Sequence, residues 1–145
     1  MRAVIQRVSR AKVSVGGEKV GEIKKGFLVL LGIHRDDDEA KISKLADKIE
    51  KLRIFEDKEG KMNLALKDVS GEILVVSQFT LYGDTEGNNR PSFIEAARPE
   101  KALPFYEKLV RLLAEKGLKV ETGRFGSHME LDFINDGPTT IIIEV

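Results

Sequence analysis

Before its first helical pattern, the chain has four segments with the character of β-strands. Residues Arg2–Val8 and Ala11–Val15 are rich in Val and Ile with polar residues interleaved, a pattern typical of strands. The dipeptide Gly16-Gly17 leads into Glu18–Ile23, and two successive glycines favour a two-residue hairpin turn. Phe27–Ile33 is apolar on both faces, so we expect a strand buried on both sides. Four strands without intervening helices argue against a doubly wound nucleotide-binding fold, in which strands and helices alternate.

Two later segments have the apolar spacing of amphipathic helices. The first follows the acidic run Asp36–Glu39 and ends near Arg53. The three aspartates of that run could suggest a metal site, but acids at a helix start also cap it and complement its dipole, which we favour. The second runs from Pro99 or Pro104 to Lys116. Because proline is best tolerated in the first turn, we expect the regular helix to begin at Pro104.

The remaining segments complete an α+β pattern. Between the second helix and the strand before it lies a loop over residues 82–98, and loops of this length in a small domain are often functional. We therefore expect one domain, residues 1–145, with a curved, barrel-like, mostly antiparallel sheet and two helices packed on it. The further strands expected are Ile73–Leu81, Leu118–Glu121, Met129–Phe133 and Thr139–Val145.

Composition excludes several classes of function. The chain has no Cys, which removes disulfides, thiolate metal sites and cysteine nucleophiles, and its 2 His make a multi-histidine metal site implausible. We expect neither a metal nor a cofactor. Lys+Arg 24 balance Asp+Glu 24, which disfavours nonspecific binding to DNA. No apolar stretch approaches the roughly 20 residues of a membrane span, so we expect no membrane partner and a cytoplasmic location.

Two polar motifs stand out from this background. Ser77-Gln78-Phe79-Thr80-Leu81 ends an apolar strand, and Asn135-Asp136-Gly137-Pro138-Thr139 is a turn-type sequence between two strands. Each alone could be an ordinary strand end or turn. Together with Val4–Val8, Asn89–Phe93 and Gly123–Met129, they resemble the D-aminoacyl-tRNA deacylase family, also called D-tyrosyl-tRNA deacylases, and the resemblance covers essentially the whole chain.

The resemblance implies a homodimeric hydrolase whose partner is the 3′ acceptor end of tRNA carrying a D-amino acid. Such an enzyme cleaves the ester to the terminal adenosine and serves chiral proofreading in translation. In that family the Gly-Pro peptide is cis and its loop enters the partner subunit's active site. Carried over, Gly137 and Pro138 of one chain would face the catalytic group of the other. That group and its supporting residues would be Ser77, Gln78, Phe79 and Thr80, with Arg7, Phe125, Gly126, Met129, Asn135 and Asp136.

These residue types suit ester hydrolysis. A tetrahedral oxyanion needs fixed donors, and the N–H groups of Phe79 and Thr80 are free to donate if the sheet ladder stops there. The Thr80 hydroxyl has no base nearby in sequence, so we favour a positioning group or backbone donor over a nucleophile. The resemblance implies instead that water attacks with help from the ribose 2′-hydroxyl of the substrate. His128, beside Met129, is expected on a strand surface rather than as a base.

Chiral selection would come from exclusion. Two carbonyl oxygens of a rigid Gly137-Pro138 turn could hold the substrate ammonium and fill the space that an L side chain requires. Glycine has no side chain to exclude, so we expect hydrolysis of mischarged glycyl-tRNA.

Two other classes of function remain open from the sequence. One is a noncatalytic module that binds RNA ends through Arg7, Arg90 and Arg124, and the other is a generic esterase that uses Thr80.

Overall fold

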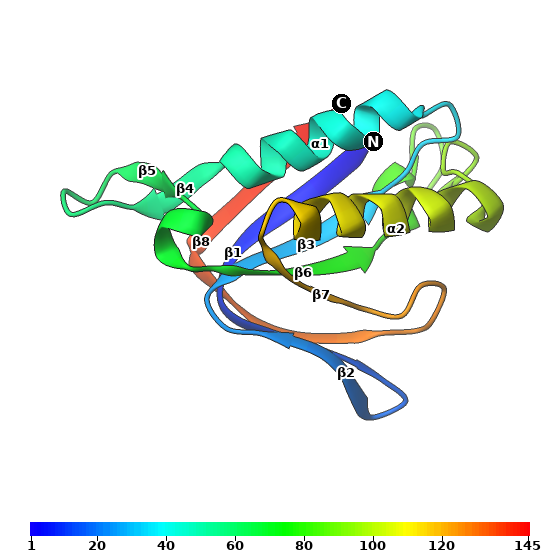
Figure 1. Cartoon of the computed structure of the whole chain (residues 1–145). Helices are drawn as coiled ribbons and strands as arrows, with labels where there is room; N and C mark the ends of the chain where they lie inside the picture. Colours follow the sequence, from blue (N-terminus) through cyan, green and yellow to red (C-terminus); the bar gives the residue numbers. More distant parts are fainter.

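The computed structural model describes all 145 residues, and both helices cover the same side of a strongly curved sheet (Figure 1). The helices are α1 (Glu39–Lys51) and α2 (Pro99–Glu115). The strands are β1 (Arg2–Val15), β2 (Glu18–Ile23), β3 (Gly26–Gly32), β4 (Arg53–Glu56), β5 (Met62–Ala65), β6 (Glu72–Ser77), β7 (Lys119–Thr122) and β8 (Glu130–Glu144). Neither helix has the length and apolar character that crossing a membrane requires.

The long strand β1 runs through the whole curved sheet, and its two halves have different partners. The strand order is β2-β1-β3-β6-β7, and β8 pairs with β1 on its other side. The first half of β1 lies between β3 and β8, and its second half lies between β2 and β8. The pairs β3–β6 and β6–β7 are parallel and the other pairs of this sheet are antiparallel. The prediction of a barrel-like, mostly antiparallel sheet with two helices is confirmed.

Two hydrophobic clusters lie on the two faces of this sheet. The larger one has 21 buried residues, including Phe27, Ile42 and Leu109, and fills the space between the helices and the sheet. The smaller one has 7, including Leu28 and Leu74, and lies inside the curl formed with β2 and the first half of β8. Neighbouring residues of β3 therefore enter different clusters. The prediction that this strand is buried on both faces is confirmed.

Several predicted boundaries are wrong. The segments Arg2–Val8 and Ala11–Val15 form one strand, and the segments on either side of Gly137 form β8, because each strand keeps its pairing beyond an irregularity in register. The predicted strand Ile73–Leu81 ends at Ser77 and continues as a 3-10 turn over Phe79–Tyr82. The short hairpin of β4 and β5 was not predicted at all.

The predicted start of the second helix at Pro104 is also wrong. The helix begins at Pro99, and Pro104 lies inside it. Proline removes one N–H there, but Pro104 is exposed, so the carbonyl left without that donor can be reached by water.

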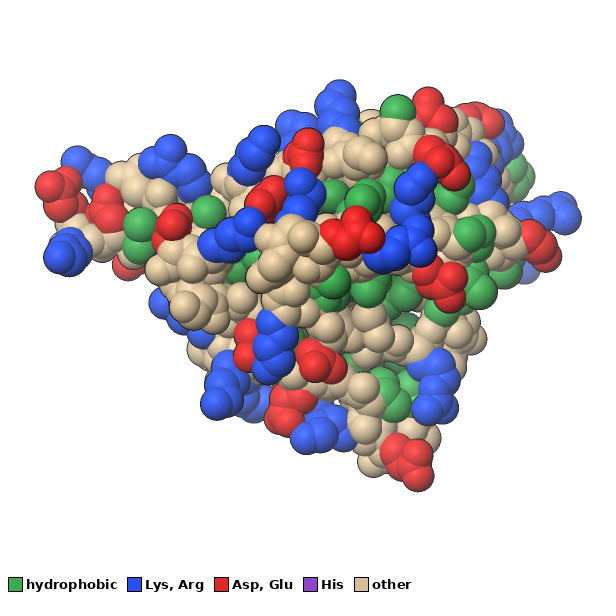
Figure 2. Space-filling view, in the orientation of Figure 1, with side chains coloured by type: hydrophobic (Ala, Val, Ile, Leu, Met, Phe, Trp, Pro, Cys, Tyr) green, Lys and Arg blue, Asp and Glu red, His purple; other side chains and the backbone are tan.

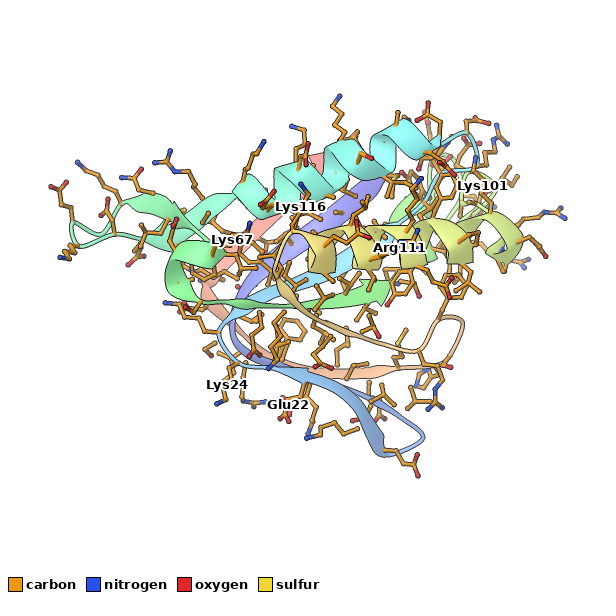
Figure 3. All side chains as sticks on the ribbon, in the orientation of Figure 1. Glu22, Lys24, Lys67, Lys101, Arg111 and Lys116 are labelled. Carbon is orange, nitrogen blue, oxygen red and sulfur yellow. The ribbon has the colours of Figure 1, made fainter.

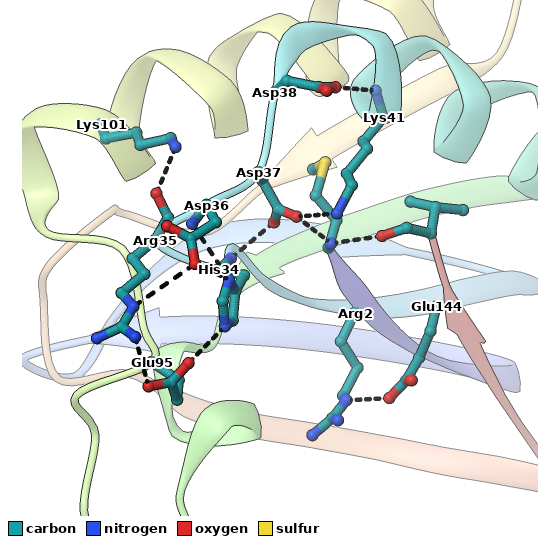
Figure 4. Close-up of polar contacts among 12 residues, drawn as sticks. Arg2, His34, Arg35, Asp36, Asp37, Asp38, Lys41, Glu95, Lys101 and Glu144 are labelled. Carbon is teal, nitrogen blue, oxygen red and sulfur yellow. Dashed lines mark hydrogen bonds and ion pairs between the residues drawn. The ribbon is translucent and has the colours of Figure 1, made fainter.

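The two ends of the chain meet at a buried carboxylate (Figure 4). The Met1 amine donates to Asp37 Oδ1 at 2.7 Å and to the Val145 carbonyl at 2.9 Å. Asp37 also accepts from the His34 N–H at 2.7 Å and from Lys41 Nζ at 3.0 Å. Burial opposes ionisation of Asp37, but these donors hold the pKa of its carboxyl below the usual range.

One aspartate of the acidic run caps α1, as predicted. Asp38 is the N-cap residue, and its Oδ1 accepts from the Lys41 N–H at 3.1 Å. Asp38 therefore caps the helix start, and Asp37 binds the amino terminus of the chain.

Candidate functional site

A cavity of about 600 Å³ opens between the end of β6, the start of α2 and the turn that joins β7 to β8. Figure 1 shows where these three elements lie. Its lining is mostly apolar. It brings together six predicted site residues from two distant segments: Ser77, Gln78, Phe79, Phe125, Gly126 and Met129. Thr80 does not line it, and neither do Arg7 or residues 135–138.

At the end of β6 the backbone leaves the sheet. The last hydrogen bond to β3 runs from the Gln78 N–H to the Leu31 carbonyl at 2.8 Å. The following 3-10 turn makes its first bond from the Leu81 N–H to the Gln78 carbonyl at 3.3 Å. The N–H groups of Phe79 and Thr80 thus precede the first donor of the turn and have no acceptor within it. They are the two N–H groups that we expected, from the sequence, to be free where the ladder stops.

The side chains of this turn are arranged around the cavity mouth. The Gln78 side-chain amide donates to Thr80 Oγ1, which fixes both groups next to the free N–H groups. The Phe79 ring is 57% exposed and packs edge-on against Phe93, with ring centroids 5.1 Å apart. An exposed aromatic ring at the mouth of an apolar cavity is a surface for stacking a flat ligand.

Arg2 supports the turn from behind. Its Nη1 donates to the Leu81 carbonyl at 2.6 Å, its Nε pairs with Glu144, and its guanidinium lies 5.0 Å from the centre of the Tyr82 ring (Figure 4 shows the Glu144 pair). Burial raises the pKa of Tyr82 to about 12, so this ring stays neutral. The start of β1 and the end of β8 therefore hold the turn that carries Thr80.

The loop over residues 82–98 forms the opposite wall. It is fastened to the end of β3 by the Ala97 N–H, which donates to the Ile33 carbonyl at 2.8 Å, and by His34 Nε2, which lies 2.8 Å from Glu95 Oε2 (Figure 4). Phe93 and Ala97 then face the cavity. The sequence marked this loop as functional by its length, but nothing in it indicated which residues would line the site.

The turn between β7 and β8 forms the third wall, and α2 positions it. The Tyr106 hydroxyl donates to the Val75 carbonyl at 2.9 Å, and its ring centroid lies 5.8 Å from that of Phe125. The same carbonyl accepts from the Gly123 N–H at 3.1 Å. A Cβ on Gly123 would lie 2.6 Å from Met129 Sδ, so any other residue there would displace the Met129 side chain, which lines the cavity.

Few lining residues can carry charge: only Arg98 and His128 do. His128 lies in the loop before β8, so the prediction of a strand-surface residue is wrong. Its imidazole makes no hydrogen bond to Ser77. The protein has no group of three or more His, Asp or Glu side chains arranged to hold a metal ion.

The second motif forms a bulge in β8. Asn135 pairs with Val8 and Thr140 pairs with Gln6, so residues 136–139 of β8 lie opposite Arg7 alone. Asn135 Oδ1 accepts from the Thr139 N–H at 2.9 Å and closes the bulge. The Gly137–Pro138 peptide bond is cis, as the resemblance implied.

Glycine is required at the centre of this bulge. Gly137 has φ +127°, a backbone conformation that side chains with a Cβ rarely adopt. A Cβ there would lie 2.5 Å from Thr139 Oγ1 and 3.0 Å from Arg7 Nη2.

Arg7 fills the space beneath the bulge. Its side chain is 6% exposed, its Nε donates to the Asp136 carbonyl at 3.1 Å, and its Nη1 donates to the Ile54 carbonyl at 2.8 Å. The carboxylates of Asp136 and Glu56 lie 3.3 and 3.8 Å away. Arg7 therefore ties the bulge to strand β4.

Within one chain, the two motifs lie near opposite ends of the pair formed by β3 and β6. Val8, next to the bulge, pairs with Gly26, and Gly26 pairs with Glu72 at the start of β6. Ser77, at the other end of β6, pairs with Leu31. Five residue steps along a strand correspond to about 17 Å, so the bulge does not reach the cavity of its own chain.

Comparisons with known proteins match nearly the whole chain. A family model described as D-Tyr-tRNA(Tyr) deacylase matches residues 4–144. A D-aminoacyl-tRNA deacylase of Thermotoga petrophila is 59% identical over 144 residues, covering 99% of this chain and 97% of that protein. One from Symbiobacterium thermophilum is 57% identical over 144 residues, covering 99% and 95%. A solved structure of a c-Myc DNA unwinding element binding protein has a TM-score of 0.94 at 41% identity, covering 100% of this chain and 99% of that one.

Proposed function

The chain belongs to the D-Tyr-tRNA(Tyr) deacylase family, and we propose from this premise how its cavity hydrolyses the ester of a D-aminoacyl-tRNA. As a D-aminoacyl-tRNA deacylase it is a hydrolase acting on ester bonds. The observation that carries the proposal is the apolar cavity in which Ser77–Phe79 and Phe125–Met129 meet. The terminal adenosine of the tRNA lies against Phe125, Gly126 and Met129. The ester then reaches the mouth at Phe79.

The protein contributes dipoles rather than acids or bases. The N–H groups of Phe79 and Thr80 point at the oxyanion, and each such donor is worth about 10²–10³ in rate. Thr80 is held by Gln78 and acts as a positioning group. The lining has no carboxylate, and Arg98 and His128 are its only ionisable groups. Assistance to the attacking water therefore comes from the ribose 2′-hydroxyl of the substrate rather than from a side chain that acts as general base.

Two measurements test this chemistry. Wild-type protein should release D-tyrosine from D-tyrosyl-tRNA and leave L-tyrosyl-tRNA intact. A tRNA that ends in 2′-deoxyadenosine and carries D-tyrosine on its 3′-hydroxyl should be hydrolysed at least ~10²-fold more slowly, since it lacks the assisting group. A deoxy substrate that reacts at the normal rate, together with a His128→Ala variant that loses activity, would make His128 the base instead.

The second part of the proposal is that the bulge at Gly137 completes the cavity of a partner subunit in a homodimer. Its support is the separation of the two motifs within one chain and the tight fastening of the bulge by Arg7 and Asn135. The carbonyls of Gly137 and Pro138 hold the substrate ammonium and occupy the space of an L side chain. Glycyl-tRNA is therefore hydrolysed as well, in the cytoplasm where aminoacyl-tRNAs are used. A glycyl-tRNA rate equal to that of an L-aminoacyl-tRNA would contradict this part.

Mixing two inactive variants separates a cross-subunit site from a site within one chain. One variant carries Phe79→Pro, which removes an oxyanion donor, and the other carries Gly137→Phe. Unfolded and refolded together, they should recover about a quarter of the wild-type activity, because half of the dimers have one intact site of two. No recovery, with dimers shown by sedimentation, would place both motifs in the same chain's site.

The DNA-related description of the structural neighbour belongs to that protein. We expect no DNA function here, because net charge is +0 and acidic and basic side chains alternate over the helical face (Figure 2).

A further inference from the structure

The arginines of this protein divide sharply by whether their side chains have a partner. Six of the nine do: Arg2, Arg7, Arg10, Arg35, Arg53 and Arg111 each contact a carboxylate, a carbonyl or a side-chain amide. The side chains of Arg90, Arg98 and Arg124 make no hydrogen bond and no ion pair, and all three residues are exposed. A guanidinium left free where the other arginines are paired is available to an outside anion.

All three belong to segments that form the cavity walls. Arg98 lines the cavity directly and immediately precedes α2. Arg124 opens the turn that continues as Phe125, Gly126 and Ser127, closed by a hydrogen bond from the Ser127 N–H to the Arg124 carbonyl at 3.2 Å. Arg90 lies in the loop that carries Phe93.

We propose that Arg98 and Arg124 bind, from opposite sides of the cavity mouth, the phosphates of the single-stranded acceptor end of the substrate, with Arg90 as an outer contact. The inference rests on the proposed function, because it takes the terminal adenosine to lie against Phe125. The ester and the 5′-phosphate leave the same ribose from its two ends. With the ester at Phe79, the phosphate therefore emerges at the mouth, which is bordered by Arg98 and by the turn that begins with Arg124.

The apolar lining and the free arginines suit different parts of the substrate. The interior is apolar and holds the base, while guanidinium groups are well suited to phosphate oxygens, which they can contact with two parallel hydrogen bonds. Phosphate contacts set affinity and register rather than the chemistry of the ester. They would let one site act on tRNAs that carry different amino acids.

The test compares two substrates that differ in phosphate. The first is D-tyrosyl-tRNA, and the second is the D-tyrosyl ester of adenosine, which has none. Arg98→Gln and Arg124→Gln should each lower kcat/KM for the tRNA about three- to tenfold more than for the adenosine ester, mostly through KM. The slope of log kcat/KM against log salt should become shallower by about 0.7 for each contact removed.

Arg111→Gln is the matched control. Arg111 lies on α2 (labelled in Figure 3), is exposed, and loses the same charge when substituted, but it does not line the cavity and pairs with Glu115. Arg98→Lys should recover part of the loss, because lysine keeps the charge without the planar fork. Equal losses on both substrates, or losses no greater than those of Arg111→Gln, would overturn the proposal.

A binding measurement keeps this result separate from the proposed activity. The dissociation constant of an uncharged RNA hairpin that ends in single-stranded CCA should rise for Arg98→Gln and Arg124→Gln but not for Arg111→Gln. If the wild-type protein hydrolysed neither substrate, the proposed function would fail and this binding series would still decide the role of the arginines. An unchanged dissociation constant in all variants would rule that role out.

Discussion

The two ends of the β3–β6 pair handle polar groups in opposite ways. At the end next to Gly26, the bulge of β8 is held by side chains: Arg7 donates to the Asp136 carbonyl, Asn135 accepts from the Thr139 N–H, and the guanidinium is almost completely buried. At the end next to Ser77, the bonds lie behind the cavity, where Arg2 holds the 3-10 turn and His34 holds the loop. The cavity face itself keeps free N–H groups and free arginines. The bulge is thus held by buried side-chain contacts, whereas the cavity face leaves polar groups available to a ligand.

The largest expected effect is at the bulge. Gly137→Ala should reduce the ratio of D-tyrosyl-tRNA to L-tyrosyl-tRNA hydrolysis at least ~10²-fold, because a Cβ would collide with Thr139 and Arg7 and move the loop. Single-turnover hydrolysis of both substrates measures this ratio. Gly126→Ala is a useful control: Gly126 also has a positive φ, +73°, but a Cβ there meets nothing within 4 Å. A Gly137→Ala variant with unchanged selectivity would contradict the description of the bulge as rigid.

Removing the support of the bulge should cost stability as well as selectivity. Arg7→Ala should lower the free energy of unfolding by about 2–3 kcal/mol, since it leaves the Asp136 and Ile54 carbonyls without donors and opens a space beside β4. Urea unfolding measures this change. Arg10→Ala, which removes a half-exposed pair with Asp132, should have a much smaller effect. Equal effects of the two substitutions would mean that the burial of Arg7 is unimportant.

At the end of β3 next to the cavity, the buried carboxylate of Asp37 makes the free energy of unfolding depend on pH. The Asp37 pKa is below its unfolded value of 3.8, so its stabilisation is present above that pH and is lost as pH falls through the lower folded pKa. Asp37→Asn should cost about 2 kcal/mol near pH 6 and flatten the decline of stability as pH falls below 3.8, measured by denaturant unfolding from pH 6 downward. Asp36→Asn, at an exposed neighbour, should keep the wild-type profile.

The smallest expected effect is at the turn itself. Arg2→Gln should lower stability by about 1 kcal/mol, because one hydrogen bond to the Leu81 carbonyl is lost. It should reduce kcat a few-fold with little change in KM, since the oxyanion donors shift while the cavity stays intact. Steady-state kinetics with D-tyrosyl-tRNA separates the two constants. A change confined to KM would mean that Arg2 supports substrate binding instead.

Local patterns predicted those parts of the fold in which neighbours in sequence interact. The hairpin at Gly16-Gly17 formed because both glycines adopt positive φ, and the first helix followed its acidic start and apolar spacing. The errors arose where distant pairing overrides local signals. Ser9 and Arg10 interrupt the strand pattern, yet β1 continues because β8 pairs with it on both sides of the irregularity.

In the candidate site, too, local motifs were predicted and contacts between distant segments were not. The motifs at Ser77 and Gly137 were recognisable because turn-type and polar residues interrupt apolar strands. No site role was predicted for Phe93, Ala97 or Arg98, since these residues meet the cavity only after the loop is fastened to Ile33 and His34.

By itself, the sequence determined most strands of the main sheet, the two helices, the family and the two motifs, because each depends on residue type and on spacing along the chain. Only the tertiary structure decided that the motifs lie at opposite ends of β6 and that three arginines are left free. Register and side-chain pairing are set by partners that lie tens of residues away. No pattern of neighbouring residues contains that information.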